Sequence, residues 1–63
     1  MRLKELREEK NINQKVVADM LNISQQAYSR YETGEREPSI ESLKKLAKFY
    51  KVSIDYIVEM NWD

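Results

Sequence analysis

The 63-residue chain contains no cysteine, no histidine, a single glycine and a single proline. Without cysteine and histidine it can form neither disulfides nor thiolate or imidazole metal sites, and it has no histidine to activate a nucleophile. One glycine also excludes a glycine-rich phosphate loop. We therefore expect no metal, no cofactor and no enzymatic activity, and a core made by packing of apolar side chains alone.

Long apolar runs are missing too, so the sequence predicts no membrane-spanning segment. The charged start MRLKELREEK lacks the apolar stretch of a signal peptide, which predicts a cytoplasmic protein. The length predicts one domain over residues 1–63. Its core should be small, because a chain of this size buries only about 60% of the surface that it exposes when unfolded.

The chain also lacks an excess of either charge, since 11 basic residues balance 11 acidic ones. A domain that binds nucleic acid is usually basic, so this balance of charge makes DNA binding a less expected function. The charge is nevertheless uneven, with residues 1–12 carrying +1, residues 40–52 carrying +3 and residues 53–63 carrying −3. Two interpretations stay open, namely an electrostatically two-sided molecule and a mixed, solvated surface.

The stretch from Gln14 to Thr33, QKVVADMLNISQQAYSRYET, has the residue spacing of two short helices that meet at a tight corner. Ala18 suits the closest approach of the two helices, and Asn22 suits a corner residue with positive φ. Ile23 can fill the corner from inside, and Ser24 can cap the second helix. The predicted core positions of this pair are Val17, Ala18, Leu21, Tyr28 and Tyr31.

Three further helices complete an all-α prediction. Leu3 and Leu6 predict a first helix over about residues 2–10, and Asn13 can cap the second. Gly34 should end the third helix in the left-handed conformation, and Pro38 prevents its continuation. Ser39 caps a fourth helix and Ser53 a fifth. Their apolar positions are Ile40, Leu43, Leu46, Ala47 and Tyr50 in the fourth, and Ile54, Ile57 and Val58 in the fifth.

With one face of the third helix assigned to the core, the other face carries Gln25, Gln26, Ser29 and Arg30. Glutamine can pair bidentately with adenine, and arginine with guanine or with a phosphate. In a helix-turn-helix, the N-terminal turn of the motif's second helix enters the major groove, and in this chain that helix is the third one. We interpret these four residues as base contacts; ordinary polar surface is the alternative.

The chain resembles the DNA-binding domain of the Cro and phage-repressor helix-turn-helix family, also called the XRE family. The resemblance rests on LKELREEKNINQ, VADMLNIS, SQQAYSRYETGEREPS and LKKLAKFYKVSIDYIV, which together cover nearly the whole chain. It implies a compact five-helix, lambda-repressor-like domain that binds double-stranded operator DNA, commonly as a homodimer, and usually represses transcription.

The resemblance also implies roles for individual residues. Gln14 matches a glutamine that holds a phosphate and that can brace the first glutamine of the next helix. Ser24, Gln25 and Gln26 match a Thr-Gln-Gln whose glutamines read bases, and Arg30 matches a position that contacts DNA. The expected contacts to the DNA backbone are Lys10, Gln14, Lys15, Ser24, Gly34 and Arg36.

Three residues depart from the family pattern. Asn22 stands where members often have glycine, a change that costs little. Glu35 stands where many members have lysine and should weaken binding, because it places a carboxylate near the expected phosphates. Lys51 stands where many members have glycine or asparagine, so we expect it at positive φ at a cost of about 1 kcal/mol.

Aromatic residues crowd the C-terminal end. We interpret Phe49, Tyr56, Met60 and Trp62 as contacts of an isologous dimer. The alternative is that Trp62 folds back to complete a small core. Tyr56 could also lie against Tyr50 in the core.

Two function classes remain. The polar residues above favour a sequence-specific transcriptional regulator, and the resemblance makes a repressor the expected kind. Zero net charge and Glu35 favour a protein-interaction or antitoxin-like module that keeps the fold but binds DNA weakly or not at all. Salt-sensitive retention on DNA would discriminate the two.

Overall fold

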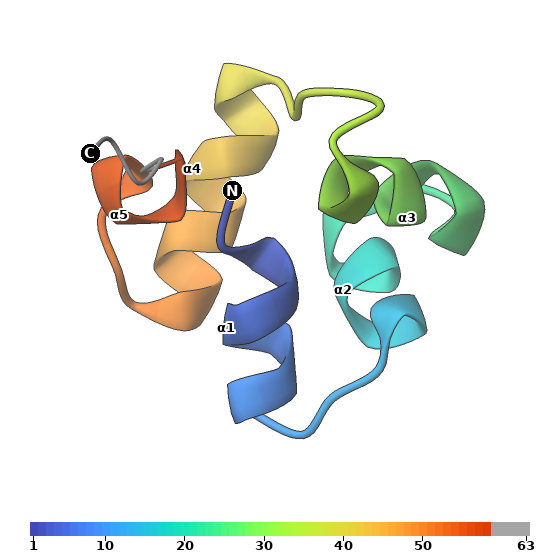
Figure 1. Cartoon of the computed structure of the whole chain (residues 1–63), viewed down its shortest axis with the longest axis horizontal. Coiled ribbons are helices and arrows are strands. Elements are labelled where there is room, and N and C mark those ends of the chain that lie inside the picture. The colour runs from blue at the N-terminus through green and yellow to red at the C-terminus, as the bar shows by residue number, and fades with distance from the viewer. Residues whose placement is uncertain (59–63) are drawn as a thin grey trace.

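A computed structural model describes residues 1–58 of the chain. These residues form five helices in the order α1 (Leu3–Glu9), α2 (Gln14–Leu21), α3 (Gln25–Thr33), α4 (Ile40–Tyr50) and α5 (Ile54–Val58) (Figure 1). The five-helix, all-α prediction is confirmed, and each helix lies within about a residue of its expected range.

The helices enclose a single small core. α2 packs mainly on α3, and α4 packs on α5, while α1 contacts α3 and α2 contacts α4. Figure 1 shows α2 and α3 on one side of the molecule and α4 and α5 on the other. The amide of Arg2 donates to the carbonyl of Ile57 (2.9 Å), which ties the start of the chain to α5. The buried apolar residues are Leu3, Leu6, Val17, Ala18, Leu21, Tyr28, Leu43, Leu46, Tyr50 and Ile57.

The helix starts follow from local capping, as the sequence predicts. The side chains of Asn13, Ser24 and Ser39 each accept a hydrogen bond from the amide three residues later, at 3.0 to 3.1 Å. The hydroxyl of Ser53 accepts one from the amide of Tyr56 (3.0 Å) at the start of α5. Each cap satisfies an amide that the first turn of a helix would otherwise leave without a partner.

The helix ends use the left-handed conformation. Asn22 after α2 has φ of 60°, Gly34 after α3 has φ of 85°, and Lys51 after α4 has φ of 59°. All three confirm the prediction. Asn11, in the loop before α2, also has positive φ (56°), a turn that was not expected from the sequence. Asparagine tolerates this region better than most residues, whereas lysine does not.

Two apolar residues differ from the prediction. Ile40 belongs to the expected apolar stripe of α4 but is 66% exposed, because it begins the helix and its side chain lies beyond the edge of the core. Tyr56, a candidate neighbour of Tyr50, is 42% exposed; its ring lies beneath the guanidinium of Arg2, 4.9 Å from the carbon at the centre of that group. No helix within residues 1–58 is long and apolar enough to cross a membrane.

Candidate nucleic-acid interface

The α2–α3 corner is held by backbone geometry. Asn22 takes the left-handed conformation, and the amide of Ile23 donates to the carbonyl of Ala18 (3.0 Å). Ala18 is buried, so the two helices approach closely at a residue with a single methyl group. The cap at Ser24 then starts α3 immediately after the corner. This geometry gives α3 a fixed direction relative to the rest of the domain.

The outer face of α3 carries the predicted base contacts. Gln25, Gln26 and Arg30 are exposed, and Ser29 is half-buried. Gln25, Gln26 and Ser29 line a shallow polar hollow of about 430 Å³. Gln14 from α2 completes its lining. The structure therefore brings together four of the predicted site residues, whereas Arg30 lies one residue further along α3 and outside the lining.

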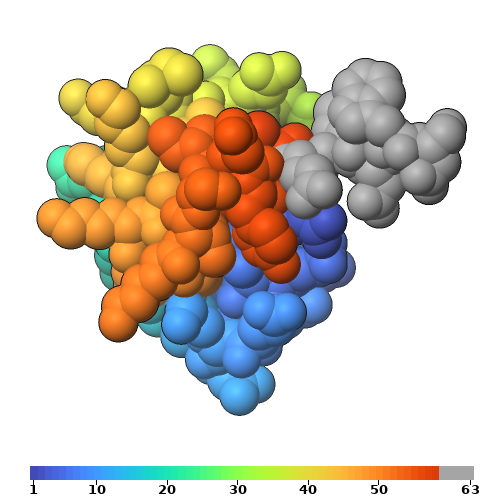
Figure 2. Space-filling model, turned by 90° about the vertical axis from the view of Figure 1, so that its left-hand side faces the viewer, coloured from blue at the N-terminus to red at the C-terminus, as the bar shows by residue number. Residues whose placement is uncertain are grey.

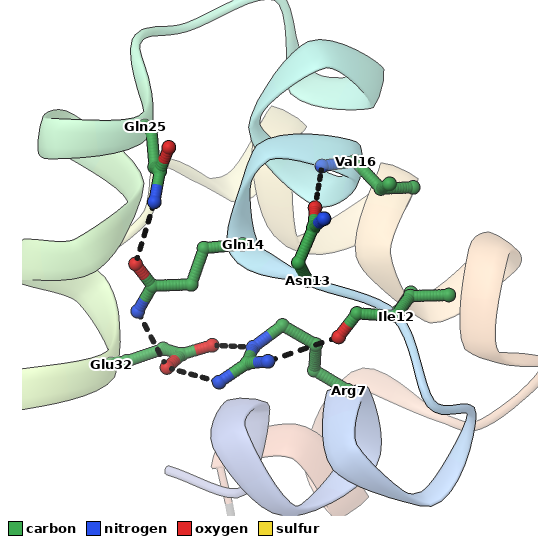
Figure 3. Close-up of polar contacts among 7 residues, drawn as sticks. All are labelled: Arg7, Ile12, Asn13, Gln14, Val16, Gln25 and Glu32. Carbon is green, nitrogen blue, oxygen red and sulfur yellow. Dashed lines mark hydrogen bonds and ion pairs between the residues drawn. The ribbon is translucent and has the colours of Figure 1, made fainter.

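A chain of polar contacts runs from α1 to the first residue of α3 (Figure 3). The Nε2 of Gln14 donates to Oε1 of Glu32 (3.0 Å), and the Nε2 of Gln25 donates to Oε1 of Gln14 (3.4 Å). Because an ionised carboxylate can only accept, Glu32 determines which end of the Gln14 amide faces it. The Gln14 oxygen is thereby directed at Gln25, as the bracing role of Gln14 predicts.

The inner end of this chain is an ion pair between α1 and α3. Arg7 Nε lies 2.6 Å from Oε2 of Glu32, and Arg7 Nη2 lies 3.2 Å from Oε1. Arg7 Nη1 also donates to the carbonyl of Ile12 (3.0 Å). The two side chains are 13% and 4% exposed, so the pair is largely removed from water.

The ion pair perturbs both ionisations. Burial opposes the charge on Glu32, but the hydrogen bonds from Arg7 and Gln14 outweigh it, and the pKa of Glu32 is lowered. The hydrogen bond to Glu32 raises the pKa of Arg7. Burial raises the pKa of the Tyr28 hydroxyl. That hydroxyl lies close enough to help lower the pKa of Glu32, although it makes no hydrogen bond of standard geometry among residues 1–58.

Sequence reasoning missed Arg7 and Glu32, yet a signal was present. Arg7 follows Leu3 by four residues, and Glu32 follows Tyr28 by four, so each charge lies on the inward side of its helix. Two opposite charges on inward faces indicate a buried pair, because a single buried charge would be very costly.

The loop after α3 carries Gly34 and Arg36, two of the residues predicted to contact the DNA backbone. Gly34 ends the helix, and the amide of Arg36 donates to the carbonyl of Arg30 (3.2 Å), which fixes the turn. The side chain of Arg36 is exposed. Glu35 is exposed as well, and its carboxylate accepts from the hydroxyl of Thr33 (3.0 Å). A guanidinium and a carboxylate are therefore adjacent on one short loop.

The other predicted backbone contacts are exposed residues near the same helices. Lys10 follows the end of α1, and Lys15 lies in the first turn of α2, where its Nζ is 3.3 Å from Oδ2 of Asp19. That exposed pair is weak and can yield to a phosphate. The hydroxyl of Ser24 accepts from the amide of Ala27 and keeps its own proton for donation.

The candidate dimer contacts have different surroundings. Phe49 is half-buried, and its ring meets that of Tyr50 edge to face, with centroids 5.0 Å apart. It is therefore partly a core residue and less available than the sequence suggests. Tyr56 is exposed beside Arg2. Met60 and Trp62, the remaining two candidates, lie outside the described residues.

This geometry agrees with the comparison to known proteins. A family model described as helix-turn-helix matches residues 3–57, which include all of α1 to α4 and most of α5. The chain belongs to this helix-turn-helix family. The family assignment confirms the resemblance inferred from the sequence, and the matched range contains every described residue of the candidate interface.

Relatives in the helix-turn-helix family have similar sequences. An uncharacterized HTH-type transcriptional regulator from the SPbeta prophage of Bacillus subtilis, YonR, is 40% identical over 92% of this chain and 54% of its own length. The cryptic phage CTXphi transcriptional repressor RstR of Vibrio cholerae is 39% identical over 90% of this chain and 51% of its own. The HTH-type transcriptional activator BcrR of Enterococcus faecalis is 40% identical over 90% of this chain and 28% of its own.

The fold is also found in a solved structure. The crystal structure of a transcriptional regulator from Listeria innocua matches with a TM-score of 0.88 and 31% identity, over 97% of this chain and 57% of that one. The chain thus spans about half the length of YonR and RstR, and just over a quarter of BcrR.

Proposed function

We propose that this domain binds double-stranded operator DNA in a sequence-specific manner. It would be the DNA-binding part of a transcriptional regulator, and we propose a repressor. The observation that carries the proposal is the exposed start of α3, where Gln25 and Gln26 stand in a polar hollow and Gln25 is held by Gln14. Membership of the helix-turn-helix family and similarity to a phage transcriptional repressor support it.

In this proposal the N-terminal turn of α3 lies in the major groove. Gln25 uses one proton of its amide nitrogen on Gln14 and keeps the other proton and its oxygen for a base edge. That remaining pair of one donor and one acceptor matches the N7 and N6 of adenine. Gln26, Ser29 and Arg30 lie along the same face and would contact the neighbouring base pairs.

Contacts to phosphates would set the position of α3 in the groove. In the loop after α3, Arg36 would supply one contact through its side chain, while the amides of Gly34 and Arg36 donate to the carbonyls of Tyr31 and Arg30 and so hold the loop in position. Gln14 and Ser24 would supply contacts at the starts of α2 and α3, and Lys10 and Lys15 would add positive charge. None of these residues except Gln14 is tied to a buried partner, so each can move to meet a phosphate.

The number of cationic contacts is small, and Glu35 opposes them. One copy of the domain should therefore bind weakly, and we propose that a homodimer covers two half-sites about 34 Å apart, one turn of the duplex. Phe49, Tyr56, Met60 and Trp62 are the residues that we propose for the dimer contact. We also propose that the protein acts in the cytoplasm, where the DNA of a bacterium lies.

Selection of bound duplexes from a random pool tests the proposal. We expect a two-fold symmetric consensus, and binding that falls steeply with salt. Gln25→Ala and Gln26→Ala should each relax one position per half-site by about 1 to 3 kcal/mol, whereas Arg36→Ala should weaken all sequences alike. If no consensus emerges and retention on DNA is insensitive to salt, the domain is instead a protein-interaction or antitoxin-like module, which its zero net charge favours.

A further inference from the structure

A second surface feature lies away from the polar hollow, on the seam where α2 packs against α4. It is a shallow depression of about 370 Å³ lined by Met20, Lys45, Lys48 and Phe49, and it shares no lining residue with the hollow at α3. Met20 and Phe49 are half-buried and pack against the core, so they form a fixed apolar floor.

The rim of the depression is basic. Lys45 and Lys48 are exposed, and within residues 1–58 neither is paired with a carboxylate. Lys44 and Lys51 add to the same region, and residues 40–52 carry a net charge of +3 in a chain whose total is zero. Figure 2 shows long side chains of α4 standing out from the surface beside α5. A local excess of this kind attracts an acidic partner.

We propose that this depression, with Met20 and Phe49 as its floor and Lys45 and Lys48 at its rim, docks an acidic segment of another protein that carries an aromatic or branched aliphatic side chain. The volume suits one or two inserted side chains rather than a folded domain. The lysines on either side would pair with carboxylates that flank the inserted residue.

Two other occupants fit the surface less well. A nucleic-acid backbone would use the lysines but gain nothing from a thioether and a phenyl ring in the floor. A lipid bilayer needs protruding apolar side chains, whereas Phe49 is half-buried and its ring packs against that of Tyr50. A protein segment uses both the floor and the rim.

This inference goes beyond the proposed DNA binding and does not depend on it. Because the depression and the hollow at α3 have separate linings, the segment and a duplex can be bound at the same time. Met20 near the end of α2 and Gln14 at its start belong to the same helix, so the docked segment would lie on a helix that also supports the hollow.

The test is a selection from a random library of displayed 12-residue peptides against the 63-residue chain. We expect enriched peptides to combine several carboxylates with at least one aromatic or branched residue. Synthetic versions should bind at least 10-fold more weakly to the variant Lys45→Glu, Lys48→Glu. The matched control is Lys4→Glu, Lys44→Glu, which makes the same change in net charge at exposed lysines outside the depression. Because Lys44 lies outside the lining and adds only to the long-range charge of the region, this control should weaken binding by less than about 3-fold. All four lysines are exposed, and circular dichroism checks that both variants fold.

Nuclear magnetic resonance locates the bound peptide. Its addition should shift the methyl signal of Met20 and the ring signals of Phe49, and leave the side-chain amide signals of Gln26 unchanged. The proposal is overturned if enriched peptides bind both double variants equally, or if their shifts centre on α3. It is also overturned if the surface instead binds vesicles of phosphatidylglycerol, or if Lys45→Glu, Lys48→Glu abolishes self-association of the chain, which would make the occupant a second copy.

Discussion

Arg7 and Glu32 form a two-point ion pair that joins α1 to α3, with Nε and Oε2 2.6 Å apart and Nη2 and Oε1 3.2 Å apart, across 25 residues of sequence. The carboxylate also accepts from Gln14, which in turn contacts Gln25. One buried group therefore contributes both to the packing of two helices and to the arrangement of a predicted base contact.

Removal of one partner of the Arg7–Glu32 pair should strongly lower the free energy of unfolding. Arg7→Met leaves the Glu32 carboxylate buried without its cation, and such a loss costs about 3 to 5 kcal/mol. The whole domain is expected to have a free energy of unfolding of about 3 to 9 kcal/mol, so this variant should lose about a third of that stability or more at 25 °C. Urea unfolding followed by circular dichroism measures the loss.

Two further variants test whether the loss of stability comes from the Arg7–Glu32 pair itself. Lys4→Met removes an exposed cation from the same helix and should change stability by less than about 0.5 kcal/mol. Arg7→Met combined with Glu32→Leu removes both charges and should recover much of the loss. An Arg7→Met variant as stable as the unmodified chain would show that the pair contributes nothing.

The same pair predicts loss of stability in acid. The pKa of Glu32 in the folded chain lies below its ordinary value of 4.5, so the folded state binds the proton less tightly than the unfolded state does. The resulting stability is fully present above pH 4.5 and is lost as the pH falls through the folded pKa.

Urea midpoints between pH 3 and 7 measure this effect. At pH values below 4.5, the urea midpoint of the unmodified chain should decrease more steeply with falling pH than that of Glu32→Gln. The exposed-site control Glu41→Gln should behave like the unmodified chain. Titration of the Glu32 carboxyl carbon by nuclear magnetic resonance gives the pKa directly, even if the glutamine variant is unstable. A value at or above 4.5 would contradict the prediction.

Local features of the fold could be predicted because each depends on a few neighbouring residues. The caps at Ser24 and Ser39 and the left-handed turns at Asn22 and Gly34 are determined by residue type and position, and all are confirmed. The exposure of Gln26 and Arg30 follows from helical periodicity once Tyr28 is assigned to the core, because each lies two residues from Tyr28 and therefore on the opposite face of α3.

Features that depend on distant contacts could not be predicted in the same way. Helical spacing indicates that Arg7 and Glu32 lie on inward faces, but the geometry of their ion pair needs α1 and α3 to meet in a particular register, which no local pattern specifies. Ile40 has a suitable period but lies at the end of α4, where the core stops. The position of Tyr56 beneath Arg2 likewise depends on how α5 meets the start of the chain.

Lys51 gives a prediction about backbone strain. Its φ of 59° is costly for a side chain with a Cβ atom, so Lys51→Gly should raise the free energy of unfolding by about 0.5 to 1 kcal/mol. The matched control Lys44→Gly lies inside α4 and should lower it by about 1 kcal/mol. Thermal and urea unfolding measure both; equal losses in the two variants would mean that residue 51 carries no strain.

Glu35 gives a prediction about DNA affinity. Glu35→Lys replaces repulsion with attraction beside the proposed phosphate contact of Arg36, so binding to all sequences should tighten, and the slope of log affinity against log salt should steepen by about 1. Asp55→Lys makes the same charge change on α5 and should have a smaller effect. Fluorescence anisotropy at several salt concentrations measures both variants. Equal effects would indicate a response to total charge rather than a local contact.

The contact between Gln14 and Gln25 predicts that a residue of α2 influences base discrimination by α3. Gln14→Met keeps the length of the side chain but removes the acceptor for the Gln25 amide, so Gln25 should lose its preferred orientation. Discrimination at the base pair opposite Gln25 should fall, by at most the 1 to 3 kcal/mol expected for Gln25→Ala, and discrimination opposite Gln26 should not change. Binding to the selected operator and its single-base variants measures both positions.

A double-mutant cycle then separates bracing from direct contact. If Gln14 acts through Gln25, Gln14→Met should have little further effect on discrimination in a Gln25→Ala background, because no side chain remains to be oriented. A uniform loss of affinity for every sequence, in either background, would instead assign Gln14 to a phosphate contact alone. The two roles are compatible, since Gln14 contacts both Glu32 and Gln25 and also lines the hollow in which a duplex would lie.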